Sequence, residues 1–191
     1  PNFIVLFPPI FGGFFMEKRS LALWQFGGYV FTSALGTLLH FLYDLTGESV
    51  AVSFFSAVNE STWEHMKLLF FPMFLFSLFE YRFFKEEYEN FRAVKLIGIL
   101  IGLILIPVFY YTYTGISGVT VDFINIAIFY IAGAIAYFIE TKLMKKGVGR
   151  KFPQKIVFPI MIGIAILFVV FTFFTPEIPL FKDPVTKTYG I

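Results

Sequence analysis

Residues 156–175 read Ile-Val-Phe-Pro-Ile-Met-Ile-Gly-Ile-Ala-Ile-Leu-Phe-Val-Val-Phe-Thr-Phe-Phe-Thr, without a single ionisable side chain. A helix of about 20 mainly apolar residues is long enough to cross the hydrocarbon core of a bilayer. In a water-soluble domain, a stretch this long and this apolar would leave much of its surface in water. The stretch therefore predicts a membrane-spanning helix, and it indicates the class of the whole fold.

The composition of the whole chain agrees with this prediction. Of the 191 residues, 58% are hydrophobic and 15% are charged, against about 45–50% and about 25% in soluble domains. These values exclude an ordinary soluble domain, and they exclude a disordered chain, which needs the opposite composition. The absence of Cys excludes disulfides, thiolate catalysis and cysteine-ligated metal centres. The net charge of +2 is too small to favour a nucleic-acid partner, so the expected partner is the lipid bilayer.

Four further stretches have the same apolar character, which gives five predicted spans. They are Leu21–Leu45, Thr62–Phe84, Ala93–Tyr113, Thr120–Glu140 and Ile156–Thr175. We expect an all-α bundle of five transmembrane helices, because lipid leaves no water to satisfy an open backbone. The Pro-containing segment 176–191 cannot continue a helix, and we expect it to be an extracytoplasmic tail that folds back over the outer end.

The first residues need a separate interpretation. Residues 1–15 are apolar but are interrupted by Pro8-Pro9 and Gly12-Gly13, and they lack the basic segment of a signal peptide. Met16 looks like a natural start. We expect residues 1–15 to be an upstream or artificial extension, or else a short interfacial segment, ahead of a transmembrane domain over residues 16–175.

The basic residues are distributed unevenly between the two sides that five spans create. Twelve lie on the side of the N-terminus: Lys18, Arg19, Arg82, Lys85, Arg92, Lys95, Lys142, Lys145, Lys146, Arg150, Lys151 and Lys155. The opposite side holds Lys182 and Lys187, with Lys67 just inside a span. Because cytoplasmic loops carry the excess of Lys and Arg, we expect a multi-pass cell-membrane protein with a cytoplasmic N-terminus.

The remaining ionisable residues gather at the opposite, outer end. Both histidines and seven of the thirteen acids lie there; the acids are Asp44, Glu48, Glu60, Glu64, Asp122, Glu177 and Asp183. His40 and Asp44 are one helical turn apart and share a face. Because ionisable groups in a membrane bundle normally face its interior or a water-filled cavity, the sequence predicts a polar site at this end.

These residue types are those that catalytic and metal sites use. The candidate catalytic residues are His40, Asp44, Glu60, Glu64 and His65. The candidate ligands for a divalent metal such as zinc are His40, His65, Glu60 and Asp122. No established ligand motif such as His-Glu-x-x-His occurs in the sequence.

Several of these residues also have a purely structural explanation. Ser61-x-x-Glu64 fits a capping box at the start of the second predicted span. Asp122 falls in the first turn of the fourth, where the helix dipole favours an acid. Lys67 would reach the outer interface or pair with Glu64. His40 has no comparable role, because a mid-helix residue cannot act as a cap.

Two segments resemble a known family. His40-Phe41-Leu42-Tyr43-Asp44 is followed by Phe54-Phe55-Ser56-Ala57-Val58-Asn59-Glu60-Ser61-Thr62-Trp63-Glu64-His65-Met66-Lys67-Leu68, which contains the motif Asn-Glu-Ser-x-Trp-Glu-His. With the tail Ile178-Pro179-Leu180-Phe181-Lys182-Asp183-Pro184-Val185-Thr186-Lys187-Thr188-Tyr189-Gly190, they resemble an uncharacterised family of small prokaryotic integral membrane proteins, catalogued as a domain of unknown function. The resemblance covers most of the chain after Met16. It implies that residues 59–67 and the tail belong together, and it implies no activity.

Three functions are compatible with these patterns. The first is a membrane enzyme that hydrolyses a lipid or small amphiphile at the outer leaflet, with Asp44 orienting His40. The second is a non-catalytic subunit or accessory protein whose outer face binds a membrane-protein partner. The third is a transporter, which is least favoured because Gln25, Ser77 and Glu140 look too scattered to form a polar path through the inner halves of the spans.

Overall fold

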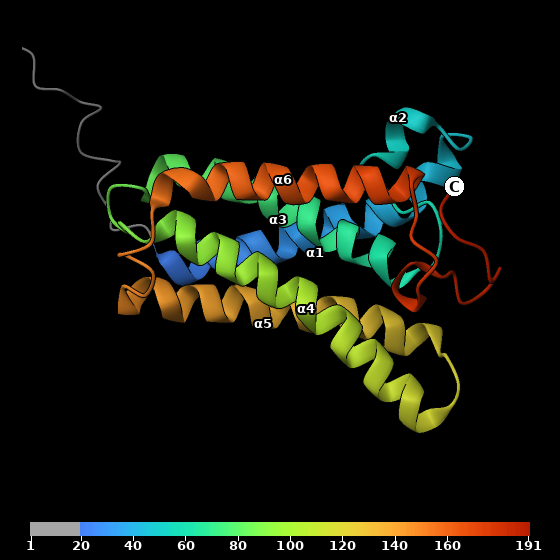
Figure 1. Ribbon diagram of the computed structural model, residues 1–191. Helices are drawn as coiled ribbons and strands as arrows, with labels where there is room; N and C mark the ends of the chain where they lie inside the picture. Colours follow the sequence, from blue (N-terminus) through green and yellow to red (C-terminus); the bar gives the residue numbers. More distant parts are fainter. Residues whose placement is uncertain (1–19) are drawn as a thin grey trace, which may run out of the picture.

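The computed structural model describes residues 20–191, and the regular elements within this range are helical apart from one isolated β-bridge (Figure 1). The five long helices are α1 (Leu21–Leu45), α3 (Thr62–Phe84), α4 (Phe91–Ser117), α5 (Asp122–Lys146) and α6 (Gln154–Phe173). Two short elements accompany them: α2 (Val50–Ser53) and the 3-10 helix η1 (Pro179–Phe181). The interpretation of residues 1–15 and of Met16 falls outside the described residues, as do Lys18 and Arg19.

The helix boundaries follow the sequence patterns closely. The first two long helices begin and end at the predicted residues, whereas α4 and α5 run further than their apolar stretches. Both end at a glycine with a left-handed backbone, Gly118 with φ 73° and Gly147 with φ 66°. Such a residue reverses the chain and satisfies the last carbonyls of a helix. The helices therefore stop at these glycines and not where the apolar composition stops.

Three of the long helices, α4, α5 and α6, are long and apolar enough to cross a membrane. The other two have comparable lengths, 25 residues in α1 and 23 in α3, but carry more polar side chains. In α3 these include Glu64, Lys67 and Glu80, all of them buried. The chain is thus all-helical over its described part, with three helices that qualify as spans.

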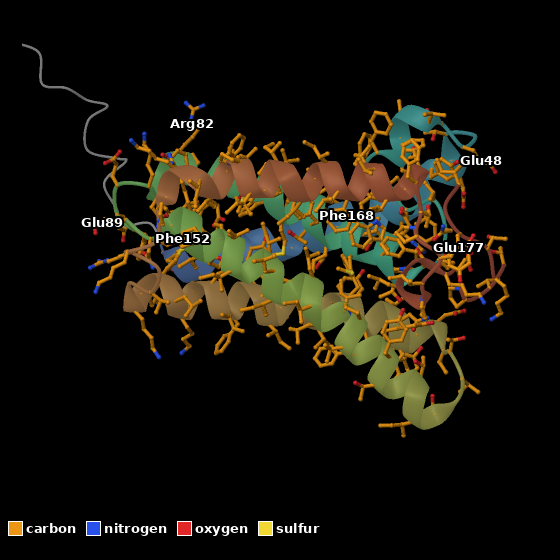
Figure 2. All side chains as sticks on the ribbon, viewed as in Figure 1. Glu48, Arg82, Glu89, Phe152, Phe168 and Glu177 are labelled. Carbon is orange, nitrogen blue, oxygen red and sulfur yellow. The ribbon has the colours of Figure 1, made fainter. Side chains whose placement is uncertain are left out.

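Four helices form a closed ring. In this ring α1 packs against α3 and α5, and α4 closes it by packing against the same two helices. Helix α6 lies outside the ring, over α3 and α4, as Figure 1 shows. The main apolar core lies between the ring helices and extends to α6, and its most buried members include Phe70, Ile99 and Ala132. Figure 2 shows Arg82, Glu89 and Phe152 at one end of the bundle and Glu48 and Glu177 at the other.

Near the end where α1 begins, each ring helix contributes one buried polar side chain to a single cluster. Lys95 of α4 forms ion pairs with Glu80 of α3 and with Glu140 of α5, the latter at 2.6 Å between Nζ and Oε2. Gln25 of α1 completes the cluster, because its amide nitrogen donates to Glu80 and its oxygen accepts from Lys95, both at 3.3 Å. We call these four residues the inner cluster.

The inner cluster corrects two sequence-based interpretations. Gln25 and Glu140 are not scattered, because residues far apart in sequence meet where the four helices face the same axis. Lys95 is buried inside the bundle, so it does not belong with the basic residues of the connecting segments with which the sequence analysis counted it. A sequence pattern within one helix cannot show which residue of a neighbouring helix lies opposite.

At the opposite end, α4 turns away from the bundle. Pro107 lies inside α4, where its ring removes a backbone hydrogen bond and favours a kink. Figure 1 shows α4 diverging from the other helices in its second half. Ile116 at its end is 84% exposed, compared with complete burial of Ile99 in its first half. We call the end where α1 begins the inner end and the opposite end the outer end, as labels only; the ring is closed at the inner end and open at the outer end.

The close approach of α4 to α5 at the inner cluster gives a test of the packing. A Cβ at Gly98 would overlap the end of the Glu140 side chain, including its Oε1 atom. We expect Gly98→Ala to displace this carboxyl group and to lower the stability by about 1–3 kcal/mol, as overpacking usually does. The measurement is the melting temperature of the purified protein in detergent.

Gly163→Ala is the matched control for this substitution. Gly163 also lies inside a long helix, but an added Cβ there would meet no atom within 4 Å. Its melting temperature should stay at or above that of the wild type. Equal melting temperatures for the two variants would contradict the packing described for Gly98.

Candidate functional site

At the open end of the bundle, two histidines and one glutamate converge. His40 lies in the last third of α1, His65 in the first turn of α3, and Glu60 in the loop before α3. The Nε2 atom of His40 lies 3.7 Å from one oxygen of Glu60, and that of His65 lies 3.5 Å from the other. One ligand atom from each residue lies within 4.8 Å of the other two. We call these three residues the His–Glu–His group.

The orientation of His65 is determined by the start of its own helix. Ser61 is the N-cap of α3 and accepts a hydrogen bond from the Glu64 N–H through its hydroxyl. The carbonyl of Ser61 lies 3.0 Å from His65 Nδ1. Because a carbonyl only accepts, Nδ1 carries a proton, and Nε2 is the ring nitrogen that faces Glu60. A backbone carbonyl on the far ring nitrogen is the usual support of a metal-binding histidine.

The tail holds Glu60 in place. The backbone N–H of Glu60 donates to Asp183 Oδ2 at 3.2 Å, and the neighbouring Asn59 donates through its side chain to the Gly190 carbonyl at 2.9 Å. The other oxygen of Asp183 accepts from the backbone N–H groups of Val185 and Thr186. Asp183 therefore closes a turn within the tail and joins that turn to the loop that carries Glu60.

An aromatic contact attaches the tail to the bundle. Phe181 of η1 is buried. The centroid of its ring lies 4.7 Å from that of Trp63 of α3 and 5.6 Å from that of Phe171 of α6. A β-bridge between Lys182 and Tyr189 closes the base of the turn. The tail thus lies over the outer end of α3 and α6, which agrees with the sequence prediction.

The His–Glu–His group opens into a pocket of about 500 Å³. The pocket lies between α1, the start of α3 and the first half of α5, and residues of the tail and of the loop before α3 complete its wall. Its lining residues are Gly36, Thr37, His40, Phe41, Glu60, His65, Leu68, Asp122, Asn125, Ile126, Phe129, Tyr130 and Val185. We call it the outer pocket.

One side of the outer pocket faces the exterior of the bundle. Phe41 of α1 and Ile126 of α5 line it and are 54% and 57% exposed. Across the pocket wall, Thr37 and Tyr130 share a hydrogen bond of 2.9 Å between their hydroxyl groups. The outer pocket therefore combines an apolar rim between α1 and α5 with polar groups near the His–Glu–His group.

The structure places Glu64 away from this pocket. Its carboxylate lies 2.5 Å from Lys67 Nζ, accepts from Thr172 of α6 at 2.9 Å, and accepts from the backbone of Val58 at 3.2 Å. Lys67 is buried and also donates to the Ser53 carbonyl. Glu64 is thus a partner within a buried ion pair. The capping box is only half formed: the Ser61 hydroxyl accepts from the Glu64 N–H, but the Glu64 carboxylate does not accept from the Ser61 N–H, which donates to Asn59 instead.

The remaining two candidates lie near the site but outside the His–Glu–His group. Asp122 lines the outer pocket in the first turn of α5. Asp44 is exposed on the last turn of α1. No hydrogen bond from Asp44 to His40 occurs among residues 20–191, and the Nδ1 atom of His40 is buried without a partner there. The structure therefore brings together three of the six predicted residues.

The three converging residues fit a small divalent metal. Two imidazole nitrogens and one carboxylate are a common zinc ligand set, and they leave one of four positions open. For bonds of about 2.0–2.1 Å, tetrahedral ligand atoms lie roughly 3.3 Å apart. The Nε2 atom of His40 lies 3.7 Å from one oxygen of Glu60 and that of His65 lies 3.5 Å from the other, and a set with one ligand atom from each residue lies within 4.8 Å, which is wider than this spacing.

Comparisons with known proteins give one match. The model described as "Family of unknown function (DUF6512)" matches residues 15–191. The match includes every helix, the His–Glu–His group and the tail. No curated protein and no solved structure matches the chain. What the site does must therefore be argued from its geometry.

The hydrogen bonds of Asp183 make the tail sensitive to acid. Burial opposes ionisation, but the N–H groups of Val185, Thr186 and Glu60 outweigh it and hold the pKa of Asp183 below its ordinary value of 3.8. A lowered pKa means that the carboxylate stabilises the tail above that value and that this stabilisation is lost as the pH falls through the lower, folded value. We expect the tail to loosen in this acidic range.

Hydrogen–deuterium exchange of the segment 183–190 measures this loosening. In Asp183→Asn we expect exchange faster on the order of tenfold at neutral pH, since hydrogen bonds to a charged group are lost, and a weaker change on acidification. Glu177→Gln, an exposed acid just after α6, is the control and should behave as the wild type. Identical exchange in wild type and Asp183→Asn would refute the role of Asp183.

Proposed function

The chain belongs to this family of unknown function, and from its own residues we propose a multi-pass membrane protein that hydrolyses a lipid or small amphiphile at a zinc-type metal site. The metal ligands are His40, Glu60 and His65. The observation that carries the proposal is the convergence of these three side chains from two separate parts of the chain, with their ligand atoms within 4.8 Å of one another at the wall of a pocket.

The membrane part of the proposal is that all five long helices cross the bilayer. Helices α4, α5 and α6 qualify by composition, and α1 and α3 occupy the ring between them. The buried face of α1 carries its polar residues Gln25 and Thr32, while exposed positions such as Leu23 and Phe26 are apolar and more than 60% exposed. The Lys and Arg excess supports a cytoplasmic N-terminus and an extracytoplasmic tail.

The chemical part follows from the ligand set. A zinc ion with three protein ligands and an open fourth position lowers the pKa of a bound water to about 7 and polarises a carbonyl group. The protein supplies the geometry: the Ser61 carbonyl orients His65, and the tail orients Glu60 through its backbone. Hydrolysis of an ester or amide is the reaction class that such a site supports.

The substrate class follows from the two kinds of wall in the outer pocket. An acyl chain suits the exposed apolar rim of Phe41 and Ile126 between α1 and α5. The polar part of the molecule would lie beside Thr37, Tyr130 and Asp122, next to the His–Glu–His group. A ligand with one apolar and one polar end, entering from the side of the outer leaflet, matches this arrangement.

Metal content tests the ligand assignment. We expect about one zinc per chain after the purified protein is equilibrated with buffered zinc, measured by elemental mass spectrometry. His40→Ala, His65→Ala and Glu60→Gln should each lower the affinity by about tenfold or more, because each removes one of three ligands. Glu48→Gln, an exposed acid in the loop after α1, should retain the wild-type value. Unchanged zinc content in the three ligand variants would exclude this site and favour an accessory role.

A second substitution separates substrate binding from metal binding. Ile126→Trp fills the apolar rim of the outer pocket without touching a ligand. We expect hydrolysis of fluorogenic acyl esters to fall by about tenfold or more while the zinc content stays unchanged. Ile116→Trp, at the exposed end of α4, is the matched control. Equal rates for the two tryptophan variants would place the substrate elsewhere.

A further inference from the structure

The inner cluster takes no part in the outer site, and its charges do not balance. Glu80 and Glu140 contribute two carboxyl groups, Lys95 contributes one ammonium group, and Gln25 is neutral. The side chains of Glu80 and Glu140 are completely buried, and that of Lys95 is 3% exposed. If all three ionisable groups were charged, the cluster would carry one uncompensated negative charge inside the ring.

Such a charge is costly at this position. An unpaired buried charge in a protein is strongly destabilising, and charged groups in a membrane bundle are retained only with partners. Within residues 20–191, Lys95 is the cation that forms ion pairs with the two carboxyl groups. Tyr137 of α5 is the other titratable neighbour, and its neutral hydroxyl is hydrogen-bonded to Thr32 at 2.8 Å. A bound proton would neutralise the excess charge.

The contacts of the two carboxyl groups differ, and this difference shows where the proton belongs. Glu80 accepts a hydrogen bond from Gln25 on Oε1 and forms its ion pair with Lys95 through Oε2, so a polar group lies beside each oxygen, although the contact of Oε2 lacks hydrogen-bond geometry. Glu140 contacts Lys95 through Oε2, whereas its Oε1 is buried without a hydrogen-bond partner in the described part of the chain. That oxygen faces the bare backbone of Gly98.

We propose that the inner cluster is a proton-binding site that holds one exchangeable proton at neutral pH, carried by Glu140 and shared with Glu80 through Lys95. The cluster is then neutral: Lys95 balances the ionised Glu80, and Glu140 is a neutral acid. The ligand of the site is a proton and not a larger cation, because the Lys95 ammonium already occupies the centre between the two carboxyl groups.

The surroundings of the site limit how the proton exchanges. Toward the inner end, Phe84, Phe91 and Met144 are buried together and separate the cluster from the loops. Toward the outer end, the hydrogen-bonded pair of Tyr137 and Thr32 is the next polar contact. Gly36, one helical turn after Thr32, already lines the outer pocket. The polar side of α1 therefore leads from the inner cluster to the outer pocket, whereas buried apolar side chains close the inner side, and we expect the proton to exchange toward the outer pocket.

Infrared spectroscopy of the purified protein in lipid nanodiscs tests the proposal, because a protonated carboxyl group has its own carbonyl stretch. The number of buried protonated carboxyl groups should equal the number of carboxyl groups in the cluster minus the number of cations. We expect one in the wild type at neutral pH, none in Glu140→Gln, none in Glu80→Gln, and two in Lys95→Met. Glu177→Gln, an exposed acid outside the cluster, should keep one.

The result in Glu80→Gln distinguishes charge balance from a simple property of Glu140. In that variant Glu140 becomes the only partner of Lys95 and should ionise, although its own surroundings are unchanged. A wild type without a buried carboxyl band, or a band that persists in both glutamine variants, would overturn the proposal. If Lys95→Met does not fold, the two isosteric glutamine variants still decide the question. None of these measurements depends on zinc or on hydrolysis.

Discussion

A charged side chain buried in a helix bundle needs a partner of opposite charge within the bundle. In this bundle the central buried charge is that of Lys95. Its two carboxylate partners and their amide neighbour come from the three other helices of the ring. Each of the four side chains lies about one or two turns from the inner end of its helix. Pairing them therefore fixes both the rotation and the vertical register of four helices at once, which apolar packing alone specifies less sharply.

A second buried ion pair also joins separate helices, at the outer end. Lys67 and Glu64 of α3 contact Thr172 of α6, and Lys67 also donates to the carbonyl of Ser53, the last residue of α2. This pair attaches α6, which lies outside the ring, and it occupies the one acid of α3 that could have competed with Glu60. The His–Glu–His group is left with two half-buried histidines and a half-exposed carboxylate. The outer end thus contains two different groups: the buried ion pair of Lys67 and Glu64, which stabilises the fold, and the more exposed His–Glu–His group, which is accessible to a ligand.

The sequence predicts the helices well and their mutual contacts poorly. Long apolar runs and the N-cap at Ser61 determine where α1 and α3 begin and end, and these were predicted to the residue. From shared depth, the sequence predicts one polar site that contains His40 and Asp44 with some of Glu60, Glu64, His65 and Asp122, and the structure brings His40, Glu60 and His65 together. The ion pair of Glu64 with Lys67 is one of the alternatives that the sequence offers, whereas the contact of Glu64 with Thr172, 108 residues away, cannot be read from a local pattern. The inner cluster is not predicted, because its four residues are far apart in sequence. The equal depth of Glu80 and Lys95, each about one turn from the inner end of its helix, is the signal that could have indicated their ion pair.

The contact between the tail and Glu60 has a consequence for how the site is made. Asp183 and Gly190 are translated after all six α-helices, yet they hold the loop that precedes α3. During synthesis, the loop that carries Glu60 therefore lacks these two hydrogen bonds until more than a hundred further residues have been made. The carboxylate of Glu60 is held in its final place only when residues 183–190 are present and folded against this loop. Formation of the outer site is therefore a late event in the folding of the chain.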